Sequence, residues 1–428
     1  MVKKTPAAEK EFQLNCLYGS DPKINEYQQN RYNKLRNDFQ KHFGNAQTKY
    51  FSSPGRTEIS GNHTDHNHGK VIAASINLDS IAISSTNDSN KVIFYSEQFD
   101  KPSKIDLTVL YPIEEERGTT ASLIRGICSG LKKQNYYIGG LNILLSSDII
   151  IGSGLSSSAS VEVLIGTIFN HFYNEDKIPA EDIAIISQYA ENNFFGKPCG
   201  LMDQLACVTG GIVAIDFNDP VKPVIEKINF DFTSTNYSVL VVDTGDNHAD
   251  LTEEYSSIPA EMKQVARYFN KEYCRDIDLE TLLKSIGKLR SKISDRSILR
   301  AIHFINENDR VEKQVKALKR KNFELFLRLV NESGNSSFKY LQNIYSPKNV
   351  EVQGLSLALA LSDVFIKKHS KGACRVHGGG FAGTIQVFLP NDLVDEYMQF
   401  MSDSFNENAV KILSVRDKGA IQLKLNKN

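Results

Sequence analysis

Apolar and polar positions follow two different periods along the chain, and the change of period predicts where strands and helices lie. Between residues 70 and 147, short apolar and β-branched runs are separated by Asn, Asp, Ser and Gly; the runs are VIAASI, SIAISS, KVIFYS and GLNILLSS. Runs of this length, bounded by turn residues, are typical of β-strands. We therefore expect these four runs to be strands of one sheet.

Three segments have the composition or the spacing of helices. Residues 25–43 are polar and end at Gly44-Asn45, a helix stop, which predicts a surface helix. Residues 156–173 and 181–195 repeat apolar residues every three to four positions and begin with Ser, Pro or acidic residues. Residues 256–343 are mostly helical by the same spacing, and residues 374–389 return to strand around a glycine cluster. The predicted fold class is α+β.

The length of the chain favours two lobes with a cleft between them. At 428 residues it exceeds what one hydrophobic core usually organises. Two further predicted strands, GGIVAIDF and YSVLVVDT, lie on either side of the turn cluster Asn218-Asp219-Pro220. A boundary there divides the chain into an N-terminal lobe of residues 1–220 and a C-terminal lobe of residues 221–428.

Charge and cysteine content exclude several classes of function. With 50 basic and 51 acidic residues, the formal net charge of −1 creates no field that attracts nucleic acid or anionic lipid. The six cysteines occur singly, which is typical of reduced core residues. The first residues have no apolar signal region, and no window has the ~18 consecutive apolar residues of a membrane span. We expect a cytoplasmic monomer that acts on small molecules, without nucleic acid or membrane partners.

A glycine and serine loop, IGSGLSSSAS at residues 151–160, lies between a predicted strand and the helix at 156–173. A glycine loop that leads into a helix start gathers unpaired backbone N–H groups and the positive end of the helix dipole. The loop therefore predicts a phosphate site, with serine hydroxyls as further donors and one of them able to ligate Mg²⁺. A serine N-cap after a tight turn is the alternative. The loop is not a Walker A motif, because GxxxxGK[ST] does not occur.

A second glycine cluster, RVHGGGFAG at residues 375–383, lies between two short predicted strands. Four glycines in six positions indicate close approach of backbone to backbone or to a ligand, and a bulged hairpin explains them equally well. The cluster fails the dinucleotide fingerprint, because its spacing is GGGxxG and a strand, TIQVFL, follows it.

The stretch GNHTDHNHG at residues 61–69 crowds three histidines into a loop between strands. A zinc site would place histidines at i and i+4 on a helix, or pair them with cysteines. A buried sugar needs a partner for each of its hydroxyls, and short polar side chains supply such partners. A metal site, a sugar site and a structural polar turn are the three interpretations, and this stretch alone leaves them open.

Four separated segments together resemble one family. Residues 54–70 resemble the galactokinase signature, and Gly200-Leu201-Met202-Asp203-Gln204 resembles the family stretch Gly-[Ile/Leu]-Met-Asp-Gln. Residues 152–160 and 375–383 resemble the phosphate loop and the third glycine motif of the galactose, homoserine, mevalonate and phosphomevalonate (GHMP) kinase superfamily. Order and spacing fit over roughly residues 25 to 420.

This resemblance implies a fold and a reaction. The fold would be the two-lobed GHMP kinase fold, with an N-terminal lobe like domain 2 of ribosomal protein S5 and a ferredoxin-like C-terminal lobe. The active site would lie in the cleft between the lobes. The reaction would be transfer of the γ-phosphoryl group of ATP to the anomeric C1 hydroxyl of a sugar, with ATP and Mg²⁺ required.

The resemblance also assigns roles to residues. Arg56 and Asp203 correspond to the catalytic pair. The predicted sugar contacts are Asn62, His63, Asp65, Gly200 and Tyr255. The predicted nucleotide contacts are Gly152, Gly154, Leu155, Ser156, Ser157, Ser158, Ala159 and Ser160, with Ser158 as the Mg²⁺ ligand. The third glycine motif is Gly378, Gly379 and Gly380. Tyr255 is matched through its interval from His248, although the arginine pair that often follows this tyrosine is absent.

The signature departs from the family pattern at three positions. Galactokinases usually have GEHTDYNGG, whereas here Asn62 replaces the glutamate, His66 the tyrosine and His68 a glycine. An amide at position 62 no longer repels a carboxylate, so galacturonate is an alternative to galactose, and N-acetylgalactosamine is another. Some relatives are regulators that bind sugar and ATP without turnover. The complete SSSAS segment favours an enzyme, and galactose remains the preferred substrate.

Overall fold

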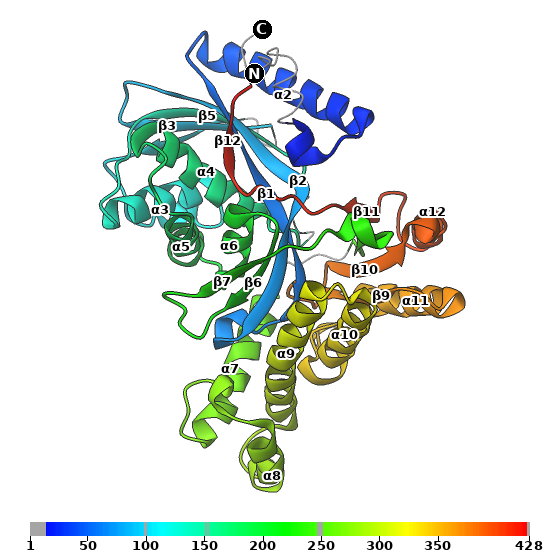
Figure 1. The fold of residues 1–428 in the computed structure, drawn as a ribbon. Helices are drawn as coiled ribbons and strands as arrows, with labels where there is room; N and C mark the ends of the chain where they lie inside the picture. Colours follow the sequence, from blue (N-terminus) through cyan, green and yellow to red (C-terminus); the bar gives the residue numbers. More distant parts are fainter. Residues whose placement is uncertain (1–13, 98–100, 150–151, 153, 246–250, 426–428) are drawn as a thin grey trace.

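The computed structural model describes residues 14–97, 101–149, 152, 154–245 and 251–425, and it contains two β-sheets with helices packed against both (Figure 1). The first sheet has the strand order β12-β1-β2-β5-β3-β4, with β6 paired to β2 and β7 paired to β6. The second has the order β11-β8-β10-β9. The prediction of an α+β fold is confirmed.

The first sheet is built on two long strands and is antiparallel apart from the β3–β5 pair. Its strands are β1 (Lys49–Ser60), β2 (Lys70–Thr86), β3 (Lys91–Ser96), β4 (Ser103–Asp106), β5 (Leu141–Ser147), β6 (Ile212–Asp216), β7 (Val224–Ile228) and β12 (Ile421–Leu423). β2 pairs with β6 through residues 70–74 and with β5 through residues 80–86.

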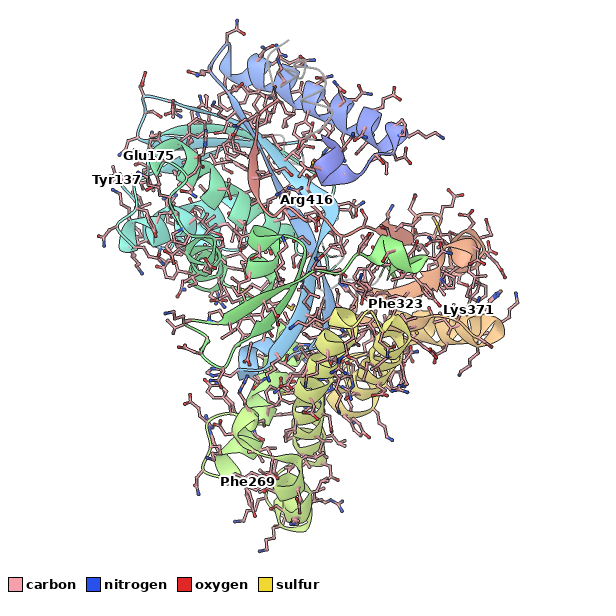
Figure 2. All side chains as sticks on the ribbon, viewed as in Figure 1. Tyr137, Glu175, Phe269, Phe323, Lys371 and Arg416 are labelled. Atoms are coloured by element: carbon pink, nitrogen blue, oxygen red, sulfur yellow. The ribbon has the colours of Figure 1, made fainter. Side chains whose placement is uncertain are left out.

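The prediction that VIAASI and SIAISS are separate strands is wrong, because β2 runs through Asn77-Leu78-Asp79 without a turn. Asp79 is fully buried in the strand, and its carboxylate accepts from Arg31 Nη1 (2.6 Å) and Arg416 Nη1 (3.0 Å). The hydroxyls of Tyr18 (2.6 Å) and Ser52 (2.5 Å) also donate to it. Charged and hydroxyl donors make this burial tolerable. Arg416 lies beside the long strands of the sheet (Figure 2).

Helices cover both faces of the first sheet, and the alternation of side chains along β2 shows which helices lie where. Ala82 packs into the core under α3 (Thr120–Lys133), α4 (Ser157–Tyr173) and α5 (Ala180–Ala190). Its neighbours Ile81 and Ile83 pack with α2 (Pro22–Phe43) on the other face (Figure 1). The period of two along a strand produces this division.

The predicted helices are present with small changes at their ends. α2 is capped by the Asp21 side chain and ends before Gly44, as predicted for residues 25–43. The predicted helix at 181–195 ends as an α-helix at Ala190 and continues as the π-helix η3 (Glu191–Phe195). α6 (Met202–Thr209) follows it.

The second sheet is antiparallel throughout, with β8 (Tyr237–Asp243), β9 (Ala373–His377), β10 (Thr384–Pro390) and β11 (Val410–Leu413). Leu240 and Val242 face α11 (Gly354–His369) and α12 (Val394–Ser402). Val239 and Val241 share a core with α9 (Asp295–Lys319) and α10 (Phe323–Ser336). The π-helix η6 (Ser337–Leu341) extends α10.

One hydrophobic core joins the two sheets. Ile59 and Ile72 of the first sheet share it with Phe388 of the second and Phe326 of α10. At the edge of this core, the ring of Phe323 (labelled in Figure 2) stacks on the ring of Phe326, with 5.6 Å between centroids. The end of β1 thereby packs against β9 and β10. α7 (Thr252–Tyr268) and α8 (Leu279–Leu289) pack on the first half of α9.

The predicted boundary at residues 218–220 falls in the connection between β6 and β7, which pair in the first sheet. The first sheet therefore extends past residue 220, and β12 joins it from the opposite end of the chain. The division into 1–220 and 221–428 stays a prediction. Within the described residues, no helix combines the length and the hydropathy needed to cross a membrane.

Candidate active site

Arg56 and Asp203, predicted from segments 147 residues apart, form a bidentate pair. Nε of Arg56 donates to Oδ1 of Asp203 (2.7 Å), and Nη2 donates to Oδ2 (2.9 Å). Arg56 lies on β1 and Asp203 on the first turn of α6. Burial works against the charge of Arg56, but Asp203 outweighs it and raises the pKa of the guanidinium. Two charge-assisted hydrogen bonds thus hold the two side chains together.

β1 also holds the glycine and serine loop. The backbone N–H of Arg56 donates to the carbonyl of Leu155 (3.1 Å), and Nη1 of Arg56 donates to the carbonyl of Gly154. Gly55 permits this approach, because a Cβ there would lie 2.7 Å from the Leu155 carbonyl oxygen. The strand of the sugar signature and the predicted phosphate loop are therefore in direct contact.

The loop residues divide into anchors and half-buried positions. Leu155, Ala159 and Ser160 are buried, and the Ser160 hydroxyl donates to the carbonyl of Ser53 (2.8 Å). Their side chains hold the loop against β1, so any nucleotide contact from them would come from the backbone. Gly152 is exposed, and Gly154, Ser157 and Ser158 are half-buried at the start of α4. Ile151 and Ser153 lie outside the described residues.

Ser156 does not cap α4 with its side chain, which was the alternative to a phosphate site in the sequence analysis. Its backbone is left-handed (φ 60°) and its side chain makes no capping bond to α4. The hydroxyl instead donates to Oδ2 of Asp203 (2.5 Å). The predicted phosphate loop, Arg56 and Asp203 form one hydrogen-bonded unit.

Glu191 is a candidate site residue that the sequence did not reveal. The Ser158 hydroxyl donates to its Oε1 (3.0 Å), and Nε2 of Gln204 bridges from Glu191 (2.9 Å) to Glu162 (3.1 Å). Burial, and then the charge of Glu191, raises the pKa of Glu162. A hydroxyl and a carboxylate side by side are oxygen ligands of the kind that Mg²⁺ prefers. The segment ENNFF carries no motif, so only the fold brings Glu191 to the loop.

The predicted sugar residues gather around the 3-10 turn η1 (Asp65–Asn67). His63 is buried, and Asp65 faces Gly200, where a Cβ would lie only 1.7 Å from Oδ2 of Asp65. Tyr255 on α7 has its ring nearly parallel to that of His63, with 6.4 Å between centroids. His248, which led to Tyr255, lies outside the described residues. The structure thus brings these four predicted positions together.

The third glycine motif supports these side chains through its backbone. The carbonyl of Gly378 accepts from Asn62 Nδ2 (2.6 Å), and that of Gly379 is 2.8 Å from His63 Nε2. The carbonyl of Gly380 accepts from the Tyr255 hydroxyl (3.0 Å). The cluster forms the turn between β9 and β10, so the hairpin interpretation is confirmed.

Comparisons with known proteins agree with this geometry. The galactokinase galactose-binding signature matches residues 37–86, and the GHMP kinases N terminal domain matches residues 122–211. A galactokinase of Clostridium beijerinckii is 30% identical over 372 residues, which cover 86% of this chain and 92% of that protein. The chain belongs to the galactokinase family. It is therefore an ATP-dependent sugar kinase of the GHMP superfamily, as the resemblance implied.

Other galactokinases and solved structures extend the comparison. A galactokinase of Clostridium tetani is 28% identical over 379 residues, covering 88% of this chain and 92% of that protein. The Lactococcus lactis galactokinase, solved in complex with galactose, has a TM-score of 0.77 at 23% identity and covers 92% of this chain and all of its own. The Methanococcus jannaschii mevalonate kinase has a TM-score of 0.61 at 18% identity, covering 86% of this chain and 98% of its own. The GHMP kinase fold is confirmed.

This family member differs from the sequence prediction at Asn62. The side chain is fully buried, and its Nδ2 donates to Glu58 Oε1 (3.0 Å) and to the Gly378 carbonyl. Its Oδ1 accepts from Ser337 (3.2 Å) and Asn343 (2.8 Å). The amide has no hydrogen-bonding capacity left for a sugar. Asn62 is a structural residue beneath the site, and not the predicted sugar contact.

Proposed function

We propose that this galactokinase-family chain transfers the γ-phosphoryl group of ATP to the C1 hydroxyl of galactose. The observation that carries the proposal is the Arg56–Asp203 pair. Both side chains are hydrogen-bonded to the predicted phosphate loop, and Arg56 lies on β1, the strand that leads into the predicted sugar residues. Relatives of similar length that are named galactokinase support the choice of sugar.

Asp203 and Arg56 would do the chemistry by position and charge. The C1 oxygen forms a bond to the γ-phosphorus while the bond to the oxygen bridging the β and γ phosphates breaks, and ADP leaves. Asp203 would orient the C1 hydroxyl and accept its proton late in the transfer. Arg56 would offset the negative charge that develops between sugar and nucleotide.

The Mg²⁺ that accompanies ATP fits Ser158 and Glu191. Their hydroxyl and carboxylate are oxygen donors 3.0 Å apart beside the phosphate loop. When bound, Mg²⁺ would neutralise phosphate charge. Ser157 and the N-terminal N–H groups of α4 would donate to the phosphates.

His63, Asp65 and Tyr255 would bind the sugar hydroxyls, with Gly200 leaving room for the Asp65 carboxylate. The galacturonate alternative was based on Asn62 and on the two nearby histidines, His66 and His68. The buried position of the Asn62 amide removes the first of these reasons. A regulator without turnover is disfavoured by the intact phosphate loop and by the Arg56–Asp203 pair.

The test is a coupled ADP-release assay on galactose, galacturonate, N-acetylgalactosamine, glucose and arabinose with Mg²⁺ and ATP. We expect the highest kcat/KM on galactose. A higher kcat/KM on galacturonate, or sugar and ATP binding without ADP release, would refute the proposal. The predicted monomeric state and cytoplasmic location stay predictions.

A further inference from the structure

A chain of three polar side chains lies within the sugar signature, and His66 is its centre. Nδ1 of His66 is 2.9 Å from Oδ1 of Asp65, and its backbone N–H donates to the same oxygen (2.9 Å). Nε2 of His66 is 3.1 Å from Nδ1 of His63. Nε2 of His63 is 2.8 Å from the carbonyl of Gly379. Both ring nitrogens of His66 are therefore engaged with predicted sugar residues.

The acceptors at the two ends decide where the protons lie. The Gly379 carbonyl only accepts, so Nε2 of His63 carries a proton and donates. Burial, and then the charge of His66, lowers the pKa of His63 to about 3, so this ring is neutral and its Nδ1 is an acceptor. Nε2 of His66 must then donate to His63. Its Nδ1 must also donate, because it faces a carboxylate oxygen of Asp65.

The three contacts together require one imidazolium in the His63–His66 pair, and a neutral His63 places that charge on His66. We propose that His66, as an imidazolium, is a positioning residue for sugar binding: it fixes the Asp65 carboxylate and the tautomer of His63 that face the sugar. The proposal rests on the proposed function, since it assumes that Asp65 and His63 contact the substrate. The family usually has tyrosine at this position, and its single hydroxyl hydrogen cannot donate in both directions.

The surroundings of His66 set the direction of its titration. Burial lowers the pKa of His66, but the charge of Asp65, its hydrogen bond and the charge of Glu58 together raise it above the ordinary value. Glu58 on β1 acts in the same sense as Asp65, and Lys263 on α7 acts against it. His66 lowers the pKa of Asp65 to about 2, although burial opposes the carboxylate charge. His303 on α9 acts on His63, further lowering its pKa.

The sign of the pH effect follows from the raised pKa. The three-residue chain is complete below the pKa of His66 and loses one donor as pH rises through it. Sugar affinity should therefore decrease on the alkaline side of neutrality, while ATP affinity should not follow. Tyr255 does not contribute in this window, because burial raises its pKa further above its ordinary value.

The experiment compares wild type, His66→Gln and the control His68→Asn from about pH 6 to about pH 10. His68 lies in the same loop, but its ring stacks on Tyr273 (3.7 Å between centroids). The sugar is the one that wild type phosphorylates fastest in the panel above. We expect the wild-type KM for sugar to rise with pH, and His66→Gln to raise it about 10- to 100-fold at neutral pH and remove the pH dependence. The KM for ATP should stay within about twofold, and His68→Asn should behave as wild type.

A second measurement does not depend on the variant folding. In wild-type protein labelled with ¹⁵N-histidine, both nitrogens of His66 should have imidazolium shifts at neutral pH, and His63 should be the neutral tautomer protonated at Nε2. A neutral His66, a pH-independent KM for sugar, or an unchanged KM in folded His66→Gln would each overturn the inference. Wild-type activity on galacturonate alone would refute galactose as the substrate. The role of His66 would then be tested by the pH dependence of the KM for galacturonate, with the same expected and refuting results.

Discussion

Replacing Asn62 by aspartate changes one buried amide nitrogen into a carboxylate oxygen and leaves the shape of the side chain unchanged. Nδ2 of Asn62 donates to Glu58 Oε1 (3.0 Å) and to the Gly378 carbonyl (2.6 Å). In Asn62→Asp both donors are lost, and two carboxylates lie side by side without solvent. Arg375 is already paired with Glu58 (2.7 Å) and can neutralise only one of them.

The free-energy cost of the second charge follows from the 3.0 Å between the atom at the Nδ2 position of residue 62 and Oε1 of Glu58. Two unit charges 3.0 Å apart repel by about 5 kcal/mol at an effective dielectric constant of about 20. The variant avoids this by taking up one proton, which costs about 1.4 kcal/mol for each pH unit above a carboxyl pKa of about 4. Burial already raises the pKa of Glu58, although Arg375 opposes it. We expect a loss in free energy of unfolding of about 4 kcal/mol at pH 7 and about 1.5 kcal/mol at pH 5.

The sign follows from linkage: the folded variant binds a proton that the unfolded chain releases, so its stability falls as pH rises. The chain has no tryptophan, so urea unfolding is followed by circular dichroism at both pH values. Asn62→Ala is the uncharged control: it removes the two Nδ2 bonds that Asn62→Asp also loses, together with the two Oδ1 bonds that Asn62→Asp keeps, and adds no charge. The reasoning is refuted if Asn62→Asp loses no more stability than Asn62→Ala at pH 7, or loses equally at both pH values.

Three further predictions concern the reaction. Asp203→Asn should lower kcat at least ~100-fold with ATP affinity little changed, and a near-normal kcat in the coupled assay would remove Asp203 from the catalytic pair. Glu191→Gln and Ser158→Ala should each raise the KM for MgATP, with galactose binding unchanged by calorimetry; unchanged MgATP kinetics in both would argue against this Mg²⁺ site. Gly200→Ala should raise the KM for sugar about 10- to 100-fold, because the new Cβ displaces Asp65; a normal KM in the folded variant would show that Asp65 is not a sugar contact.

Much of the fold could be predicted because its signals are local. Short apolar runs bounded by turn residues predicted β3 (KVIFYS) and β5 (within GLNILLSS), and the Gly44 stop marked the end of α2. The break expected inside β2 failed for a long-range reason. Asp79 is a turn residue by local preference, but Arg31 and Arg416, which are 48 and 337 residues away, neutralise it inside the strand.

The residues of the candidate site also divide into those that local motifs predicted and those that only long-range contacts place. Arg56 and Asp203 could be predicted because each lies in a motif, although only the structure shows that they pair. Asn62 was misassigned because its partners Ser337, Asn343 and Gly378 come from 275 to 316 residues away. Glu191 was missed because it carries no motif and its proximity to Ser158 depends on how α4 and η3 pack.

β12 pairs with the outer edge of β1, and this pairing has a consequence during synthesis. Ser52 lies opposite Ile421, and about 360 residues separate the end of β1 from the start of β12. At about 5–20 residues per second, a ribosome needs roughly 20–70 seconds to make them. Until then β1, the strand that carries Arg56, has an unpaired edge open to other nascent chains. Slowing translation between β1 and β12 should therefore increase aggregation of newly made protein, because β12 covers residues 50–52 of this edge only once it has been made.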